Sequence, residues 1–560
     1  MMTVQDAMEA AVAKHRAGKL PEAEAIYRQV LQQHPDYPDA LHLLGVIATS
    51  VKRYSDAVDL IQRAIKGSPN SPAYYVNLGV ALDQLGRLDE AIEAFSKATK
   101  LNGQYAQAFS NLGNALGKKG LLAEAIAASR EAVRLNPDFP EARNNLGNAL
   151  QQSGHAEEAI ISLRRAVALR PNYVEAHCNM GKSLLAINQV PEAIAELRRA
   201  IALHPNFPEA HNNLGSALAA AGEIDQSIQA FAQATRLAPN FAIAHFNLGI
   251  MLLLKGNFEQ GWPEYEWRLG VAEFNPPVRL KQMPWDGSDL AGRRILLHAE
   301  QGLGDVIQFV RYVPEVARRG GKITLLCHAD LHRLVRGVEG IDQLITPNAP
   351  LGAFDEHCPL ASLPRVFKTN LATIPGHTPY LTADAELMRQ WQSRIEGDGR
   401  FSTGLKVGLV WAGRAAHAND RQRSMRLAEL LPLVKCPGVS FFSLQKSEAG
   451  KQAASLGTEF PITDWTEEIG DFADAAALVA NLDLVITVDT AAAHLAGALG
   501  KPVWLMLAEL PDWRWMLGRN DSPWYPSMRL FREQKKGKSE GAASRWGETV
   551  GQIVEALCTR

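Results

Sequence analysis

Small and apolar residues recur every 34 residues through the first half of this 560-residue chain. Glycine occupies one recurring position, at Gly45, Gly79, Gly113, Gly147, Gly181, Gly215 and Gly249. Two further series of small residues run from Ala23 to Ser227 and from Ala64 to Ala234. Prolines recur with the same step from Pro35 to Pro239. Small residues let two helices cross closely, and proline ends a helix. The pattern therefore predicts two-helix units stacked in a line.

These units resemble the tetratricopeptide repeat (TPR). We expect an α-solenoid of about eight helical hairpins over residues 1–273. The last unit differs, because Phe258, Trp262 and Tyr265 fall on one face of its second helix, expected around Phe258–Leu269. A terminal repeat needs a cap or a neighbour. We interpret these aromatic residues as the joint with the C-terminal half, followed by a proline-containing linker over 274–292.

Asparagines form a second series with the 34-residue step, two positions before each glycine. They are Asn77, Asn111, Asn145, Asn179, Asn213 and Asn247. An asparagine side chain offers both a donor and an acceptor, so a row of them can bind the backbone of any polypeptide. Alternatively, these side chains only bond to neighbouring helices. The segment Asn144–Leu150 resembles the repeats of O-GlcNAc transferase, which implies a ladder that binds a substrate polypeptide in the groove.

From Arg293 onward, strands and helices alternate. We expect strands at Ile295–His298, Lys322–Cys327, Gln343–Thr346, Lys406–Trp411, Val439–Leu444, Leu484–Val488 and Val503–Leu507, and helices at Val306–Arg319 and Glu386–Ile395. Alternation of this kind builds parallel sheets covered by helices. The fold class predicted is therefore α + α/β, with a TPR solenoid followed by two Rossmann-like lobes, 293–383 and 384–560. Ligands in such sheets bind at the carboxyl ends of the strands.

Charge and cysteine content narrow the possible functions. The formal net charge is only −2, which argues against a nucleic-acid-binding surface. The five cysteines are scattered and contain no Cys-x-x-Cys pair, so we expect neither a disulfide framework nor a structural zinc site. We interpret the first fifteen residues as the opening of an amphipathic helix and not as a signal peptide, and we find no apolar run of membrane-spanning length, so we expect a cytoplasmic protein without a membrane span.

The loop after the first expected strand contains Gly302 and Gly304, followed by Asp305 at a helix start. Ile307 stands where a dinucleotide fingerprint has its third glycine, so a dinucleotide site is not expected. A carboxylate at this position can accept a proton in general base catalysis. The commoner role of an aspartate there is a helix cap.

A second loop, Asp489-Thr490-Ala491-Ala492-Ala493-His494, follows a strand of the second lobe. A helix start with small residues attracts anions. We therefore expect a diphosphate to bind at Asp489, Thr490, Ala491 and His494. An ordinary N-cap and a packed histidine are the alternative. Arg421, Arg423 and Lys446 follow neighbouring strands, where they could neutralise phosphates.

These two loops together resemble the paired signatures of the heptosyltransferase family of GT-B glycosyltransferases. The resemblance implies that Asp305 is the base, and that Gly302, Gly304 and the Asp489–His494 segment belong to a nucleotide-sugar site. It implies inverting, metal-independent transfer from a nucleotide diphospho-sugar, without a cofactor, to an acceptor hydroxyl. We expect the TPR groove to present a polypeptide acceptor or partner protein. The alternative is a non-catalytic scaffold with a degenerate transferase half.

Overall fold

The computed structural model describes residues 3–271, 280, 282–401, 403–415, 420–533 and 545–560. The chain forms two compact units that divide after Ala221. Parts of the predicted linker, 274–279 and 281, lie outside the described residues. The predicted domain limits at 273, 292 and 383 remain predictions.

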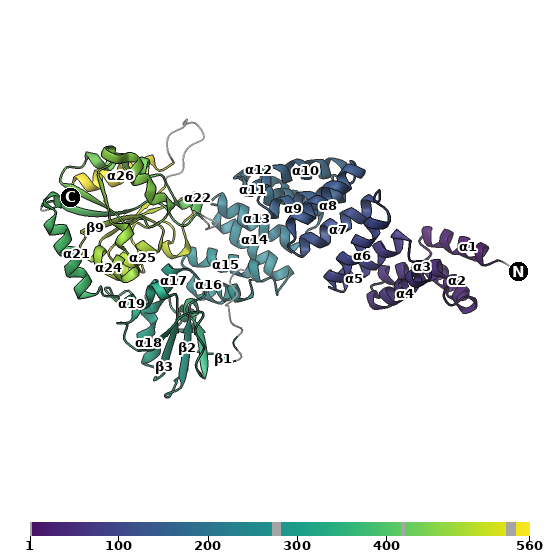
Figure 1. Cartoon of the computed structure of the whole chain (residues 1–560), viewed down its shortest axis with the longest axis horizontal. Coiled ribbons are helices and arrows are strands. Elements are labelled where there is room, and N and C mark those ends of the chain that lie inside the picture. Colours follow the sequence, from purple (N-terminus) through teal and green to yellow (C-terminus); the bar gives the residue numbers. More distant parts are fainter. Residues whose placement is uncertain (1–2, 272–279, 281, 402, 416–419, 534–544) are drawn as a thin grey trace. The chain divides into compact units, whose positions relative to one another are not determined.

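The first unit consists of antiparallel helix pairs, as the 34-residue pattern predicts (Figure 1). Its helices are α1 (Val4–Arg16), α2 (Leu20–Gln33), α3 (Pro38–Ser50), α4 (Tyr54–Gly67), α5 (Pro72–Gln84), α6 (Leu88–Leu101), α7 (Ala106–Lys118), α8 (Leu122–Leu135), α9 (Pro140–Gln152), α10 (Ala156–Leu169), α11 (Val174–Ala186), α12 (Val190–Leu203) and α13 (Pro208–Ala220). The recurring glycine is required by close packing within each pair. A Cβ on Gly147 would lie 2.5 Å from Cγ of Leu163, which is closer than real side chains approach.

The second unit opens with the remaining repeat helices, α14 (Ile224–Leu237), α15 (Ala242–Leu254) and α16 (Phe258–Tyr265). The second helix of the last hairpin, expected as far as Leu269, is α-helical only to Tyr265. A 3-10 turn, η1 (Glu266–Gly270), continues it. Pro263 lies inside α16 and has no N–H for the helical ladder, which accounts for the short helix.

The first lobe is a five-stranded parallel sheet in the order β1-β5-β2-β3-β4. Its strands are β1 (Met283–Pro284), β2 (Arg294–His298), β3 (Lys322–Leu326), β4 (Ile341–Ile345) and β5 (Glu356–Pro359), and its helical segments are α17 (Leu303–Phe309), η3 (Val310–Tyr312), α18 (Val313–Ala317), η4 (Ala329–Leu331), α19 (His332–Val335), η5 (Leu360–Ser362) and α20 (Leu363–Val366). The single helix expected at Val306–Arg319 is wrong, because three shorter segments replace it. Pro314 lies where a continuous helix would need its N–H.

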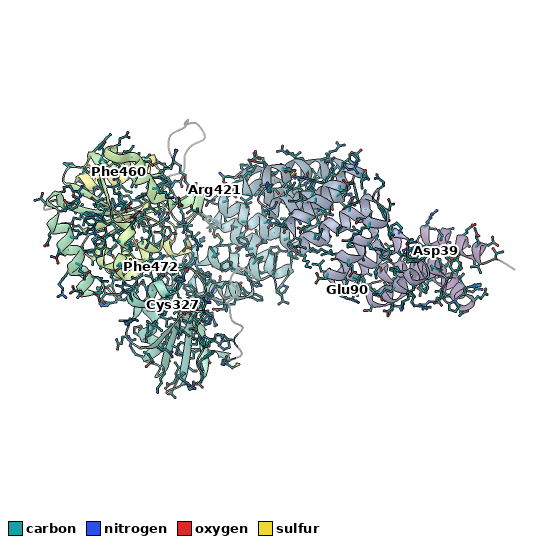
Figure 2. The ribbon with its side chains drawn as sticks, in the orientation of Figure 1. Asp39, Glu90, Cys327, Arg421, Phe460 and Phe472 are labelled. Carbon is teal, nitrogen blue, oxygen red and sulfur yellow. A yellow bond between two sulfur atoms is a disulfide. The ribbon has the colours of Figure 1, made fainter. Side chains whose placement is uncertain are left out.

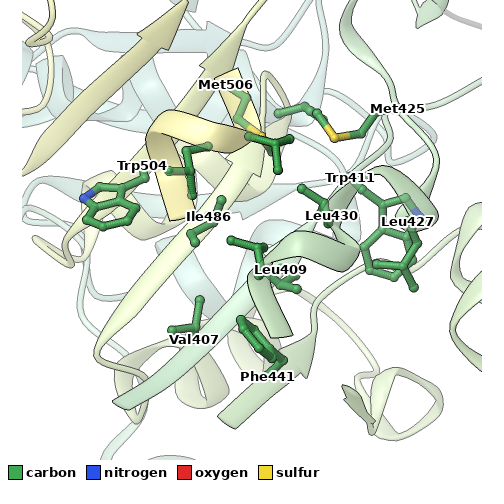
Figure 3. Packing of buried hydrophobic residues seen from close by; sticks show 14 of the residues in the cluster. Val407, Leu409, Trp411, Met425, Leu427, Leu430, Phe441, Ile486, Trp504 and Met506 are labelled. Carbon is green, nitrogen blue, oxygen red and sulfur yellow. The ribbon is translucent and has the colours of Figure 1, made fainter. Parts of the chain in front are cut away.

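The second lobe is a six-stranded sheet in the order β11-β10-β9-β6-β7-β8, and all its strand pairs are parallel. Its strands are β6 (Leu405–Val410), β7 (Val439–Ser443), β8 (Ile462–Asp464), β9 (Leu484–Val488), β10 (Val503–Leu507) and β11 (Met528–Arg532), and its main helical segments are α21 (Ala385–Gly397), α22 (Asp420–Arg423), η7 (Leu427–Lys435), α23 (Lys451–Leu456), α24 (Phe472–Ala480), α25 (Ala491–Ala498), η11 (Trp513–Trp515) and α26 (Gly547–Cys558). Figure 3 shows side chains of β6, β7, β9, β10 and η7 packed into one core.

One expectation about the cysteines is wrong. Cys436 and Cys558 form a disulfide across a sequence separation of 122 residues. The bond joins the end of η7 to α26, whose Val550, Ile553 and Leu557 belong to the core of the second lobe. Sequence spacing gives no sign of such a pairing, because the tertiary fold alone brings the two residues together.

Candidate active site

Asp305 is the third residue of α17, directly after the glycine loop at the carboxyl end of β2. The N-cap position of this helix belongs to Gly302 and not to Asp305. The backbone N–H of Asp305 donates to the carbonyl of Gly302 at 3.0 Å. The side chain of Asp305 is 22% exposed, so it keeps some access to solvent.

The glycine loop meets the start of α25 from the second lobe. A Cβ on Gly304 would lie 2.9 Å from Cδ2 of His494 and 3.5 Å from Cα of Ala491. Helices α17 and α25 also lie side by side in Figure 1. Glycine at position 304 therefore allows the two lobes to touch, and the structure brings the two predicted loops together.

Arg514 from η11 is the cation that faces Asp305 at this junction. Its Nη2 donates to Oδ1 of Asp305, and its Nη1 donates to Oδ1 of Asp512 at 2.9 Å. Its Nε donates to the side chain of Gln308 in α17. Burial raises the pKa of the Asp305 carboxyl, while the charge of Arg514 acts in the opposite direction.

The segment at the start of α25 has Thr490 as its N-cap residue, but the hydroxyl of Thr490 does not cap the helix. It lies 3.3 Å from the hydroxyl of Thr487. The carbonyl of Asp489 accepts a hydrogen bond from Nη1 of Arg423 at 3.0 Å. Burial, reinforced by the Asp512 carboxylate, raises the pKa of Asp489 to about 6.

His494 is buried one turn into α25. Its Nδ1 lies 2.8 Å from the hydroxyl of Tyr525, and its ring stacks on Trp515 at 5.3 Å between centroids. Burial and the charges of Arg514 and Arg311 hold the pKa of His494 well below its usual value. The imidazole is therefore neutral near pH 7 and interacts as a hydrogen-bonding group.

The other predicted cations lie differently. Lys446 is exposed, and its Nζ donates to the carbonyl of Ile469. Arg421, labelled in Figure 2, is an exposed residue of α22, and its carbonyl accepts from Nη1 of Arg545 at 3.2 Å. Of the three predicted cations, only Arg423 contacts the Asp489 segment in the described interactions.

Sequence reasoning missed Arg514, Asp512, Trp515 and Tyr525. All four lie between β10 and β11, after the carboxyl end of a strand. The run Asp512-Trp513-Arg514-Trp515 places one arginine between two tryptophans, and this pattern was the available signal. Arginine next to aromatic rings is typical of stacked, desolvated cation sites, and here the guanidinium lies 4.4 Å from the centroid of a Trp513 ring.

The last repeat contacts both lobes. Nε1 of Trp262 donates to the carbonyl of Thr369 in the first lobe at 2.8 Å. Its ring also lies 5.3 Å from that of Trp513 in the second lobe. The Tyr265 hydroxyl donates to Gln301, which immediately precedes Gly302, at 3.1 Å. The aromatic face of α16 therefore lies at a joint with the C-terminal half, as interpreted from the sequence.

A buried contact between an arginine and a carboxyl group also lies at this joint. Arg268 of η1 has no exposed side-chain surface, and its Nε and Nη2 donate to Oε1 of Glu300 at 2.8 and 2.6 Å. Nη2 also donates to the hydroxyl of Ser362 at 2.6 Å. Because Glu300 precedes the glycine loop by two residues, this pair fixes the chain just ahead of Asp305.

Four asparagines of the series, Asn77, Asn145, Asn179 and Asn213, form hydrogen bonds with the preceding repeat. Nδ2 of Asn145 donates to the carbonyl and hydroxyl of Ser110 at 3.2 and 3.1 Å, and Nδ2 of Asn179 donates to Oδ1 of Asn144 at 2.9 Å. Asn213 donates to Sγ of Cys178, and Asn77 bonds to His42. All six asparagines are half-buried. These contacts favour the structural alternative for the Nδ2 groups, whereas peptide binding by the series stays a prediction.

The glycosyltransferase family 9 (heptosyltransferase) profile matches residues 448–509, which include β9, the Asp489–His494 segment and β10. A TPR repeat profile matches 215–256, and that of the cilia and flagella-associated protein 70 C-terminal domain matches 2–213. The chain has TPR repeats in its N-terminal half and a heptosyltransferase-like domain in its C-terminal half. The match over residues 448–509 supports the glycosyltransferase class for this domain.

Individual proteins match smaller parts of the molecule. Protein FlbA of Caulobacter vibrioides is 28% identical over 321 residues, which are 53% of this chain and 52% of FlbA. This chain therefore spans about half the length of that relative. The APC/C hetero-tetramer Cut9-Hcn1 is 19% identical and covers 45% of this chain and 49% of the solved chain, with a TM-score of 0.39. The TPR protein YrrB is 23% identical over 33% of this chain and 95% of its own, with a TM-score of 0.28.

No described helix is long and apolar enough to cross a membrane.

Proposed function

We propose that the C-terminal half is an inverting glycosyltransferase that uses a nucleotide diphospho-sugar and a polypeptide acceptor. The observation behind this proposal is the meeting of Asp305 and the start of α25 at one junction between the lobes. One loop offers a carboxylate to an acceptor, and the other offers a helix start and cations to a diphosphate.

The proposed reaction is a single displacement. Asp305 accepts the proton of an acceptor hydroxyl, whose oxygen forms a bond to the anomeric carbon. The bond from that carbon to the diphosphate breaks, and the start of α25 with Arg423 and Arg514 stabilises the departing charge. Neutral His494 stays available as a hydrogen-bonding partner for the donor. A resident metal or cofactor is not part of this proposal.

Asp305→Asn tests the proposed base. Because Asp305 is not the N-cap residue, the amide should leave α17 intact while removing the proton acceptor. We expect transfer from radiolabelled sugar nucleotides to lysate acceptors to fall by about a hundredfold or more, at nearly unchanged melting temperature. Asp330→Asn, an exposed first-lobe change, is the matched control. Retained transfer would place the base elsewhere, and no donor binding or consumption by the wild type would favour the scaffold alternative.

The acceptor side of the proposal depends on the repeats. A triple replacement of Asn145, Asn179 and Asn213 by alanine should weaken binding of labelled unstructured peptides, measured by anisotropy, without changing donor binding. Ser110→Ala is the control, since it removes a partner of Asn145 but keeps the asparagine. If triple and control variants lose no peptide affinity, the series serves only to join repeats.

A further inference from the structure

Arg514 connects the two lobes through all three of its guanidinium nitrogens. They contact Asp305 and Gln308 of the first lobe and Asp512 of its own loop. The side chain is only 8% exposed and lies against Trp513. A guanidinium in this position holds the Asp305 carboxylate, the same group that an acceptor hydroxyl would need to reach.

Arg514 lies in a cluster of charged groups. Asp305 of α17, Asp489 ahead of α25 and Asp512 ahead of η11 provide three carboxylates, and Arg514 and Arg423 are the cations that act on them directly. The other titratable groups around this cluster are neutral His494, the buried hydroxyls of Tyr265 and Tyr525, the Arg311 guanidinium, the pair of Arg268 with Glu300, and Asp420 beside Arg423. A bound diphosphate would compete with the three carboxylates for the Arg514 guanidinium.

This inference rests on the proposed function. We propose that Arg514 is shared between Asp305 and the donor: it pairs with Asp305 when no donor is present, and it turns to the diphosphate when the donor binds. Asp305 is then released toward the acceptor hydroxyl. Donor binding thus precedes the activation of Asp305 as the base. The donor sugar is not attacked until the Arg514 side chain has moved.

Two physical consequences follow from the exchange of partners. A carboxylate that loses its guanidinium in a buried place becomes more basic and takes up a proton from solvent when no acceptor is present. With an acceptor present, the ionised fraction of Asp305 instead takes the proton of the acceptor hydroxyl. The guanidinium meanwhile neutralises charge on the leaving diphosphate, so Arg514 would control the base as well as stabilise the leaving group.

Proton uptake on donor binding tests this exchange without measuring activity. The probes are UDP-, GDP-, ADP- and CDP-sugars, whose pyrophosphate diester has no proton to lose near neutral pH. Titration calorimetry of the full chain in buffers of different ionisation enthalpy gives the protons exchanged per bound donor. We expect the wild type to take up a sizeable fraction of one proton at about pH 6.5 and less at about pH 9. Asp330→Asn should take up the same amount.

Two variants test whether Asp305 takes up the proton and whether Arg514 binds the donor. Asp305→Asn should bind the same sugar nucleotide without proton uptake. Arg514→Lys keeps the positive charge but removes the planar guanidinium, which can donate to two oxygens at once. Donor affinity should therefore fall by about tenfold or more. Circular dichroism checks that the fold is retained.

The following results would overturn the proposed exchange of partners. Binding without uptake in the wild type, or uptake that persists in Asp305→Asn, overturns the exchange and assigns any proton to His494 or Asp489. Unchanged donor affinity in Arg514→Lys also overturns it. Failure of the wild type to bind any of the four probes overturns the proposed function as well.

Discussion

Glu300 is a buried carboxylate whose effect on stability should change sharply with pH. Its side chain is 1% exposed, and it accepts two hydrogen bonds from Arg268 through Oε1. Within the described part of the chain, its Oε2 has no hydrogen-bond partner. Burial outweighs the charge of Arg268 and raises the pKa of Glu300 from 4.5 to about 7.

The sign of the pH dependence follows from the protonation of Glu300 in the folded state compared with the unfolded state. Between pH 4.5 and 7 the folded protein keeps the proton that the unfolded chain has already released. The free energy of unfolding therefore decreases as pH rises through this interval. At about 1.4 kcal/mol per pH unit, the interval corresponds to about 3 kcal/mol lost by pH 8. Glutamine resembles the neutral acid in shape and charge, so Glu300→Gln should remove this loss.

We therefore expect Glu300→Gln to match the wild type near pH 5 and to exceed its unfolding free energy by about 2–3 kcal/mol near pH 8. Urea denaturation followed by tryptophan fluorescence across that range measures the difference. Glu315→Gln, which removes an exposed carboxylate of the same lobe, controls for the loss of one negative charge. Parallel stability curves for wild type and Glu300→Gln between pH 5 and 8 would refute the reasoning.

Three further substitutions test how the helices and the second lobe are held together. Gly249→Ala should destabilise the second unit by about 1–3 kcal/mol in urea denaturation, because its Cβ would lie 2.4 Å from the backbone nitrogen of Tyr265. Gly117→Ala, whose Cβ would meet only Ala125 at 3.9 Å, should instead gain up to about 1 kcal/mol. Replacing Cys436 by serine opens a link across 122 residues and should lower the unfolding free energy by about 3–5 kcal/mol, an effect that reductant reproduces in the wild type but not in the variant.

The repeats and most sheet strands were readable from the sequence for a physical reason. A period of 34 residues is imposed by identical packing in every hairpin, so glycine and alanine are required wherever helices touch. Strands β9 and β10 have the predicted limits because both are buried along their whole length; β10 is a continuous apolar run, and β9 is interrupted only by Thr487. Strands β1, β5, β8 and β11 were not predicted. The first three have two, four and three residues, too few for a periodic signal, and the five residues of β11 include the charged Arg529 and Arg532.

The candidate site was predictable only in part. Asp305 and His494 stand in motifs that follow strands, so topology places each at the carboxyl edge of its own sheet, and the packing of α17 against α25 brings the two edges together. Arg514 stands in no such motif, and its role depends on η11 reaching the first lobe. The choice of Lys446 as a phosphate ligand rested on its place after β7, but its side chain in fact bonds to the carbonyl of Ile469. The direction in which a side chain points at the end of a strand depends on tertiary contacts, and a single sequence does not show these contacts.

The last hairpin of the repeats packs as part of the C-terminal compact unit. Helices α14 to α16 fall in the same compact unit as both lobes, although they keep the repeat pattern. Trp262 contacts each lobe, and Tyr265 and Arg268 bond to the residues just ahead of the glycine loop. A displacement of α16 would therefore move Gln301 and Glu300, and with them the start of α17.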